Sequence, residues 1–313
     1  MNAPRTRVQR RPVHGVLLLD KPLGLSSNQA LQKCKWLLRA EKAGHTGTLD
    51  PLATGVLPLC FGAATKFGQM QLEADKTYEA TIRLGVTTTT GDAEGDVLAE
   101  RAVPAVTPAM LDEVARRFTG PIRQVPPMFS ALKKDGKPLY EYARAGEEVE
   151  REAREVCIHA LALSVVDALH LKLVATVSKG TYIRTLGEDI AQALGCGGHL
   201  TSLRRTGTGQ FKASQCITLP AFEALDEPAR AAALLPVDAL LHDHAPVTLD
   251  AENAGRFLSG LRRRGDWPDH EHIAVYGRDP RALLGTAHVK AGELIPGRLL
   301  APTEIQQILQ TAS

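Results

Sequence analysis

Cysteine is scarce in this chain of 313 residues, and the way it is distributed excludes common extracellular scaffolds. The five cysteines are scattered, odd in number and never spaced as CxxC (Cys34, Cys60, Cys157, Cys196 and Cys216). This pattern argues against a disulfide framework or a cysteine zinc site and indicates reduced thiols. We therefore expect a cytoplasmic protein.

Long apolar stretches are also missing. No run reaches the roughly 18 residues that a membrane-spanning helix needs. The basic start, MNAPRTRVQRRPVHG, leads only into the short VLLL and lacks the apolar segment of a secretory signal. We expect neither a membrane span nor secretion.

The motifs of common cofactor and hydrolase sites are absent as well. Gly44, Gly47 and Gly55 have the wrong spacing for a dinucleotide fingerprint, no P-loop lysine stands among them, and no GxSxG exists. The triplets His242-Asp243-His244 and His270-Glu271-His272 lack a further ligand set, so we interpret them as exposed polar residues. The sequence thus predicts no cofactor and no metal.

Net charge is only +2, but the basic residues are unevenly placed. They cluster at Lys133, Lys134 and Lys137, at Arg204-Arg205, and at Arg262-Arg263-Arg264. Each cluster alone is typical of a solvated face, whereas together they leave room for a phosphate-rich partner.

The order of the predicted elements favours an α+β class. A buried strand is expected over 13–19, a helix capped by Ser26 or Ser27 over 28–39, and an alternating strand over 77–84 that starts its inward face with Tyr78. Thr107-Pro108 opens another helix, and a further helix follows KGTYIR at about 185–194. Intermixed helices and alternating strands predict a mixed, largely antiparallel sheet covered by helices. A linker is expected near 236–248, before a small accessory domain.

One acidic residue stands out in GHTGTLDPLATGVLPL, residues 44–59. Asp50 is the only charged residue of the segment apart from any charge on His45. It is either a turn aspartate, since Asp-Pro starts turns well, or a lone catalytic carboxylate. A buried carboxylate would need a buried cation from elsewhere in the chain. The residues alone leave both interpretations open.

Several segments resemble the TruB family of tRNA pseudouridine-55 synthases. They cover most of residues 12–220 in order: DKPLGLSSN (20–28), GHTGTLDPLATGVLPLCFGAATK (44–66), KTYEATIRLG (76–85), SKGTYIRTLGEDI (178–190) and LRRTGTGQF (203–211). The stretch VPPMFSALKKDGKPLYEYARAGEEVER looks like the family's RNA-gripping insertion.

The resemblance implies a pseudouridine synthase fold with a small C-terminal PUA-like, β-rich domain. The expected divisions are a disordered basic tail at 1–12, a catalytic domain at 13–240 with its insertion at about 124–152, and the small domain at 246–313. The implied reaction is the isomerisation of uridine 55 in the T-arm of tRNA to pseudouridine. The base would be flipped out, without cofactor or metal. The partner is tRNA, and we expect a monomer that needs no protein partner.

The resemblance also implies roles for single residues. Asp50 becomes the catalytic aspartate, as nucleophile or base, and Arg184 the arginine that pairs with it. Tyr78 stacks on the uracil, Leu203 borders it, and His45 takes the space that the flipped base leaves.

Three expectations concern the surroundings of the site. Tyr182 shares a face with Arg184 if that segment is extended, and should line the same pocket. Lys21-Pro22 is expected to give structural support near the site. The loop TTTTGD, residues 87–92, is expected to lie outside the chemistry.

The expected RNA contacts come from the basic clusters, with Tyr140 and Tyr142 interleaved (Lys133, Lys134, Lys137, Arg204 and Arg205). One alternative function is a tRNA-folding helper that does not need Asp50. Another, a synthase guided by a small nucleolar RNA, is disfavoured because no partner-docking extension is evident.

Overall fold

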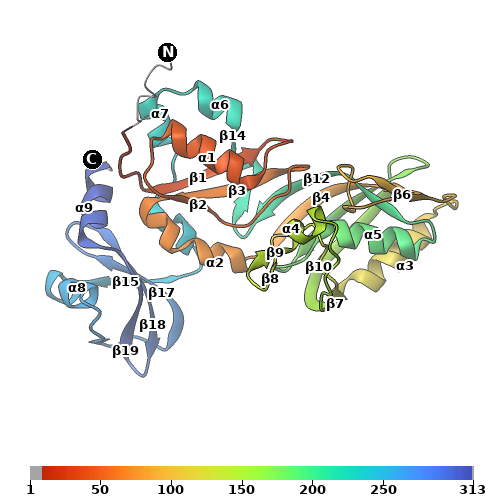
Figure 1. Ribbon diagram of the computed structural model, residues 1–313. Coiled ribbons are helices and arrows are strands. Elements are labelled where there is room, and N and C mark those ends of the chain that lie inside the picture. Colours follow the sequence, from red (N-terminus) through yellow and green to blue (C-terminus); the bar gives the residue numbers. More distant parts are fainter. Residues whose placement is uncertain (1–8, 312–313) are drawn as a thin grey trace, which may run out of the picture.

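The computed structural model describes residues 9–311 and contains a long sheet of ten strands and a separate sheet of five. Figure 1 shows the long sheet running across the molecule, with the small C-terminal sheet below its left end. The predicted disordered tail falls mostly on residues 1–8, which lie outside the described residues. At residues 10 and 11 the chain is already attached, because Arg10 Nη1 donates to Ala40 O (2.9 Å) and Arg11 N donates to Arg39 O (2.8 Å).

The long sheet is mixed and largely antiparallel, as the sequence predicts. Only the β1–β14 and β3–β12 pairs are parallel among its described strands. Its order is β14 (Ile217–Thr218), β1 (Gly15–Lys21), β3 (Ala53–Phe61), β12 (Gly198–Thr208), β4 (Lys76–Leu84), β11 (His170–Val177), β10 (Arg154–Val165) and β7 (Gly120–Gln124). Two short strands extend it, β2 (Ala43–His45) beside β3 and β13 (Phe211–Lys212) beside β12.

Local sequence signals explain where the main elements begin. The alternation of residues 77–84 is confirmed, because Tyr78, Ala80, Ile82 and Leu84 of β4 are buried while the residues between them are not. Ser26 caps α1 (Ser27–Leu37) in a reciprocal capping box with Gln29, and Thr107 caps α3 (Pro108–Phe118). The predicted helix after KGTYIR is α5 (Ile183–Ala193).

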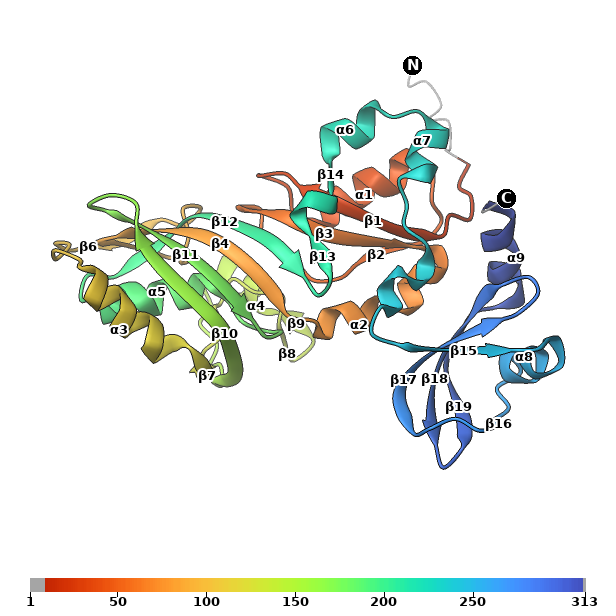
Figure 2. The ribbon, with the colours of Figure 1, turned by 180° about the vertical axis from the view of Figure 1, so that it is seen from behind.

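Helices α1, α3 and α5 bury their apolar sides in one hydrophobic cluster with strands of the long sheet. The cluster includes Leu31 of α1, Leu111 of α3 and Ile190 of α5, together with Leu57 and Ile82 of the sheet. Two short helices, α6 (Leu219–Ala224) and α7 (Glu227–Ala232), lie with α1 at the end of the sheet formed by β14 and β1 (Figure 2).

The small sheet has the order β15 (Ala245–Leu249), β17 (His270–Gly277), β18 (Ala282–Lys290), β19 (Glu293–Leu299) and β16 (Arg263–Arg264). Helices α8 (Ala251–Leu258) and α9 (Pro302–Thr311) accompany it. This β-rich unit is what the fold-class prediction requires at the C-terminus.

The expected linker near 236–248 is not a free connection. Residues Val237–Leu241 form a 3₁₀ turn, η3, and Val237, Leu240 and Leu241 are buried in a cluster shared by both sheets. Tyr276 of β17 reaches back to Asp238, with 3.1 Å between the hydroxyl and Oδ2. Proline and polar residues suggested a linker, but the apolar side chains between them fasten the two units together.

The remaining elements are short and lie between those already described. The connection from η1 (Gly62–Lys66) to β4 holds α2 (Gly68–Glu73), and β5 (Val86–Thr88) pairs with β6 (Val97–Glu100). Within residues 124–152, β8 (Lys133–Lys134) and β9 (Lys137–Pro138) form a hairpin that leads into α4 (Leu139–Arg144). A 3₁₀ turn, η2 (Ala213–Gln215), separates β13 from β14.

Candidate active site

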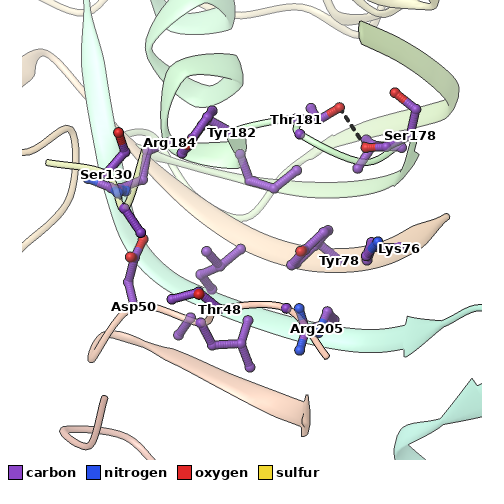
Figure 3. Close-up of a pocket in the computed structure, with 18 of the residues that line it drawn as sticks. Thr48, Asp50, Lys76, Tyr78, Ser130, Ser178, Thr181, Tyr182, Arg184 and Arg205 are labelled. Atoms are coloured by element: carbon purple, nitrogen blue, oxygen red, sulfur yellow. Dashed lines mark hydrogen bonds and ion pairs between the residues drawn. The ribbon is translucent and has the colours of Figure 1, made fainter. Parts of the chain in front are cut away.

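A cavity of about 330 Å³ opens where the 46–52 loop, between β2 and β3, meets the start of α5. Five residues predicted to form the site line it together: Asp50, Tyr78, Tyr182, Arg184 and Leu203 (Figure 3). They come from four separate parts of the chain, which the sheet brings to one place. A second cavity, of about 500 Å³, adjoins the first and shares Asp50 and Arg184 with it.

The loop that carries Asp50 is held by the start of α1. Ser27 Oγ accepts a hydrogen bond from Leu49 N (2.7 Å) and donates one to Leu49 O (3.0 Å). Gly47 has φ +101°, a left-handed conformation that favours glycine. The residue before Asp50 is therefore fixed, which limits where the carboxylate can point.

Arg184 is a buried cation that pairs with the half-buried carboxylate of Asp50. Its Nη2 lies 2.9 Å from Asp50 Oδ2, and its side chain is 5% exposed against 37% for Asp50. It also donates from Nη1 to Thr90 O (2.9 Å) and from Nη2 to Phe129 O (2.7 Å). The guanidinium is thus fixed on its inner side and presents one edge to the carboxylate.

The segment that holds Arg184 is helical rather than extended. Tyr182 is the N-cap residue of α5 and Arg184 lies in its first turn. The condition under which Tyr182 and Arg184 would share a strand face, an extended segment, is therefore not met, but both residues line the same cavity as expected. The helix start brings them together because the backbone turns between them.

A second carboxylate, Asp92, was not predicted. Its Oδ2 lies 3.6 Å from Arg184 Nε, and its side chain is 3% exposed. Its Oδ1 accepts from Thr90 Oγ1 and from Glu94 N (3.0 Å). The expectation that the 87–92 loop lies outside the chemistry is wrong, because Thr90 and Asp92 both hold Arg184. In the sequence, Thr-Gly-Asp is typical of an ordinary turn, and nothing local signals this contact.

Opposing electrostatic effects act on the pKa of the Asp50 carboxyl group. Removal from water raises the pKa of Asp50 above its ordinary value, the Arg184 guanidinium lowers it, and the Asp92 carboxylate raises it again. Lys21 is fully buried nearby, and burial lowers the pKa of its ammonium to about 8. That ammonium donates to Pro22 O (2.9 Å) and approaches Pro51 O (3.5 Å), so it braces the residue after Asp50.

The walls of the first cavity are largely apolar near the sheet. Strand register sets Leu203 opposite Ala80 and Arg205 opposite Tyr78, which places Leu203 and Tyr78 on the same face. Tyr78 is 9% exposed and Leu203 8%. Burial raises the pKa of the Tyr182 phenol, so this hydroxyl stays neutral near pH 7. These side chains offer an aromatic and an aliphatic surface beside a carboxylate.

His45 lies at the end of β2 and lines the second cavity. Burial, reinforced by the Arg205 guanidinium, lowers the pKa of its imidazole, which keeps the ring neutral. Its Nδ1 is buried and has no hydrogen-bond partner among the described residues. His45 and Tyr78 therefore belong to different cavities, which meet at the Asp50 loop.

The predicted RNA-binding residues fall into two environments. Lys133 and Lys134 are exposed on the β8–β9 hairpin, and the Lys137 ammonium lies 4.2 Å from the centre of the Tyr142 ring. Arg204 forms a two-fold ion pair with Asp20 (2.8 and 2.9 Å), while Arg205 is only 1% exposed and lines the first cavity. The two arginines therefore do not form one exposed basic patch, because successive residues of a strand face opposite sides. Their contact with RNA stays a prediction.

The two histidine triplets meet in the fold through one residue each. The His244 and His272 rings lie 5.3 Å apart, but within residues 9–311 no group of three metal-binding side chains could hold an ion. In the same range, no helix has the length and apolar character needed to cross a membrane.

Comparison with known proteins identifies the family. Residues 35–183 match the model of the TruB family pseudouridylate synthase N-terminal domain, and residues 184–242 match that of the tRNA pseudouridylate synthase B C-terminal domain. The tRNA pseudouridine synthase B of Verminephrobacter eiseniae is 65% identical over 98% of this chain and 95% of that protein. The protein of the same name from Cupriavidus metallidurans is 60% identical over 94% of this chain and 96% of its own length.

A solved structure agrees with these matches. The Cbf5-Nop10-Gar1 complex contains a chain with TM-score 0.69 and 26% identity, covering 93% of this chain and 86% of that one. Together with the relatives, it shows a pseudouridine synthase fold. The chain therefore belongs to the TruB family of pseudouridine synthases, isomerases that act on tRNA.

Proposed function

We propose that this enzyme converts uridine 55 in the T-arm of tRNA to pseudouridine, with Asp50 as its catalytic carboxylate. The observation that carries the proposal is the Asp50–Arg184 pair. It is an anchored carboxylate, 2.9 Å from a buried guanidinium, at the wall of a cavity with aromatic and aliphatic sides.

The cavity suits a flipped pyrimidine. A base stacked in the T-arm must leave the stack before its glycosidic bond can be reached, at a cost of a few kcal/mol. Tyr78 offers a ring face for the uracil, and Leu203 and Tyr182 border it, with C1′ of the ribose beside Asp50. His45, in the adjoining cavity, fills the space that the base vacates.

The reaction needs one group that acts on the sugar or the base as the C1′–N1 bond breaks. Asp50 can do this as a nucleophile at C1′ or as a base. Arg184 holds the carboxylate in one orientation and favours its ionised form. The uracil then turns within the cavity and its C5 bonds to C1′, which displaces Asp50 where Asp50 had bonded to C1′. C5 then loses its proton and N1 gains one, so the product is an isomer of the substrate.

RNA binding is assigned to the insertion at 124–152, whose hairpin presents Lys133, Lys134 and Lys137. Cations on this hairpin can neutralise phosphates of the T-arm while the rest of the surface recognises its shape. Because cavity and hairpin belong to one chain, the proposal needs no protein partner.

The test is pseudouridine formation in an unmodified tRNA transcript, mapped by position, with wild type beside Asp50→Asn. We expect wild type to convert uridine 55 alone, and the variant to bind the transcript with unchanged affinity and convert nothing. Conversion by both proteins would remove Asp50 from the mechanism. Binding by both without conversion by either would favour the tRNA-folding helper, and conversion elsewhere would overturn the position.

A further inference from the structure

Gln124, the last residue of β7, binds the backbone of Tyr182 with both ends of its side-chain amide. Its Nε2 donates to Tyr182 O (3.3 Å), and its Oε1 accepts from Tyr182 N (3.1 Å). Gln124 is 3% exposed, and turning its amide over would set donor against donor and acceptor against acceptor. The orientation of this clasp is therefore determined by its partners.

These two hydrogen bonds from Gln124 lie at the start of α5, where the helix has no side-chain cap of its own. Tyr182 is the N-cap residue of α5, but its side chain makes no capping hydrogen bond. Helix starts leave backbone donors unsatisfied unless something else binds them. Gln124, at the end of strand β7 and 58 positions away in the sequence, accepts the hydrogen bond from Tyr182 N.

The position held in this way controls two side chains of the site. Tyr182 itself lines the cavity, and Arg184 follows two residues later with its Nη2 on Asp50. In Figure 3 Arg184 points from the start of α5 toward Asp50, with Tyr182 beside it. A shift of the first turn would move the guanidinium relative to the carboxylate.

Gln124 also begins the insertion. Five residues further on, Phe129 O accepts from Arg184 Nη2 (2.7 Å). The stem of the insertion therefore touches the start of α5 twice, through a side-chain amide and through a backbone carbonyl.

We propose that Gln124 is a positioning residue for pseudouridine formation: it sets Tyr182 and the first turn of α5 so that Arg184 meets Asp50. The inference rests on the proposed function of that pair. Gln124 is buried and lines neither cavity, so its removal should slow the chemical step and leave tRNA binding intact.

The first experiment compares Gln124→Met with Gln210→Met in single-turnover assays with saturating enzyme. Gln210 is the matched control, because its amide also donates to a backbone carbonyl, that of Ala239, away from both cavities. We expect Gln124→Met to lose about 10- to 100-fold in rate, as small misplacements of a catalytic group do, and Gln210→Met less than about 2-fold. Affinity for tRNA, measured in an Asp50→Asn background to prevent turnover, should stay within about 2-fold.

The second variant, Gln124→Glu, preserves the shape and tests the hydrogen bonds. Ionised, its second oxygen faces Tyr182 O and repels it; protonated, it donates there as the amide did. Burial raises the pKa of such a carboxyl, so its rate relative to wild type should rise as pH falls, by at most about tenfold per pH unit.

A flat ratio for Gln124→Glu across about pH 5.5 to 8 would overturn the proposal, as would a Gln124→Met defect that lies wholly in tRNA affinity. The assay follows whichever tRNA uridine the wild type converts. If the wild type does not convert uridine 55 but converts another uridine, the proposed function is wrong, whereas the comparison of the Gln124 variants can still be interpreted.

Discussion

The two basic regions predicted to bind RNA differ completely in the folded protein. The lysines at 133, 134 and 137 stand on a two-strand ribbon, and the first two of them are exposed. Arg205 is almost fully buried against the loop that carries Asp50, and its Nε donates to Val56 O (2.7 Å). Its Nη2 has no hydrogen-bond partner among the described residues. Basic residues therefore have two different environments: the exposed lysines are accessible to RNA, whereas the buried Arg205 shapes a cavity.

The comparison teaches that buried charge marks the site more reliably than clustered charge. Burying a cation costs free energy that exposed lysines never incur, so it persists where a partner or a function requires it. Arg184 has its partners in Asp50 and Asp92. Arg205 lies against Gly47, where an added β-carbon would come within 3.4 Å of its Nη1, and so supports the loop that carries Asp50.

Among substitutions of the buried arginines, Arg184→Lys should have the largest effect on the rate. Lysine keeps the charge but cannot hold Asp50, Thr90 O and Phe129 O at once with a planar fork. We expect the single-turnover rate to fall by at least about 100-fold, with tRNA affinity within about 2-fold of wild type. A lysine variant with near wild-type rate would show that charge alone suffices.

The neighbouring arginines allow a direct contrast. Arg205→Met removes the support beside Gly47 and should slow turnover by about 10- to 100-fold. Arg204→Met removes only a partly exposed ion pair with Asp20, so stability should change by less than about 1 kcal/mol and turnover by less than about 2-fold. The turnover rates and the thermal unfolding of both variants test this contrast. Equal effects of the two substitutions would show that the two faces of β12 do not differ in function.

The pH dependence of the rate should separate the two regions further. In the proposed mechanism Asp50 acts in its ionised form, and burial raises its folded-state pKa above 3.8. The rate should therefore fall on acidification through that raised pKa, at higher pH than for an ordinary carboxyl group. Single-turnover rates from about pH 4 to 8 measure this limb. Variants of the 133–137 hairpin should leave the acidic side of this pH–rate profile unchanged. A profile that shifts in these variants would show that the hairpin influences the ionisation of Asp50.

The smallest effect on chemistry should come from replacing Lys133, Lys134 and Lys137 with alanine together. We expect weaker tRNA binding and a shallower salt dependence, with the logarithmic slope reduced by about 0.7–0.9 for each phosphate that is no longer neutralised. The rate at saturating enzyme should be unchanged. Affinity titrations at several salt concentrations test this, and an unchanged slope would mean that the hairpin does not touch phosphates.

Much of the fold could be predicted from local patterns, since caps and alternation act over a few residues. Ser26, Thr107 and the alternating β4 strand were predicted correctly because each signal lies within its own element. The structure near 236–248 was not, because its apolar residues become a shared core only when two sheets approach.

The candidate site divides in the same way. Local sequence shows that Asp50 stands alone in a glycine-rich loop, and it implies that a buried cation must accompany Asp50 if it is buried, because an unpaired carboxylate is costly away from water. The groups that hold this cation in place are visible only in the folded chain. Arg184, Asp92 and Gln124 come from distant segments, and their distances from one another depend on how strands register and where α5 begins. Local sequence carries no record of such contacts, since they arise from the packing of elements that form without them.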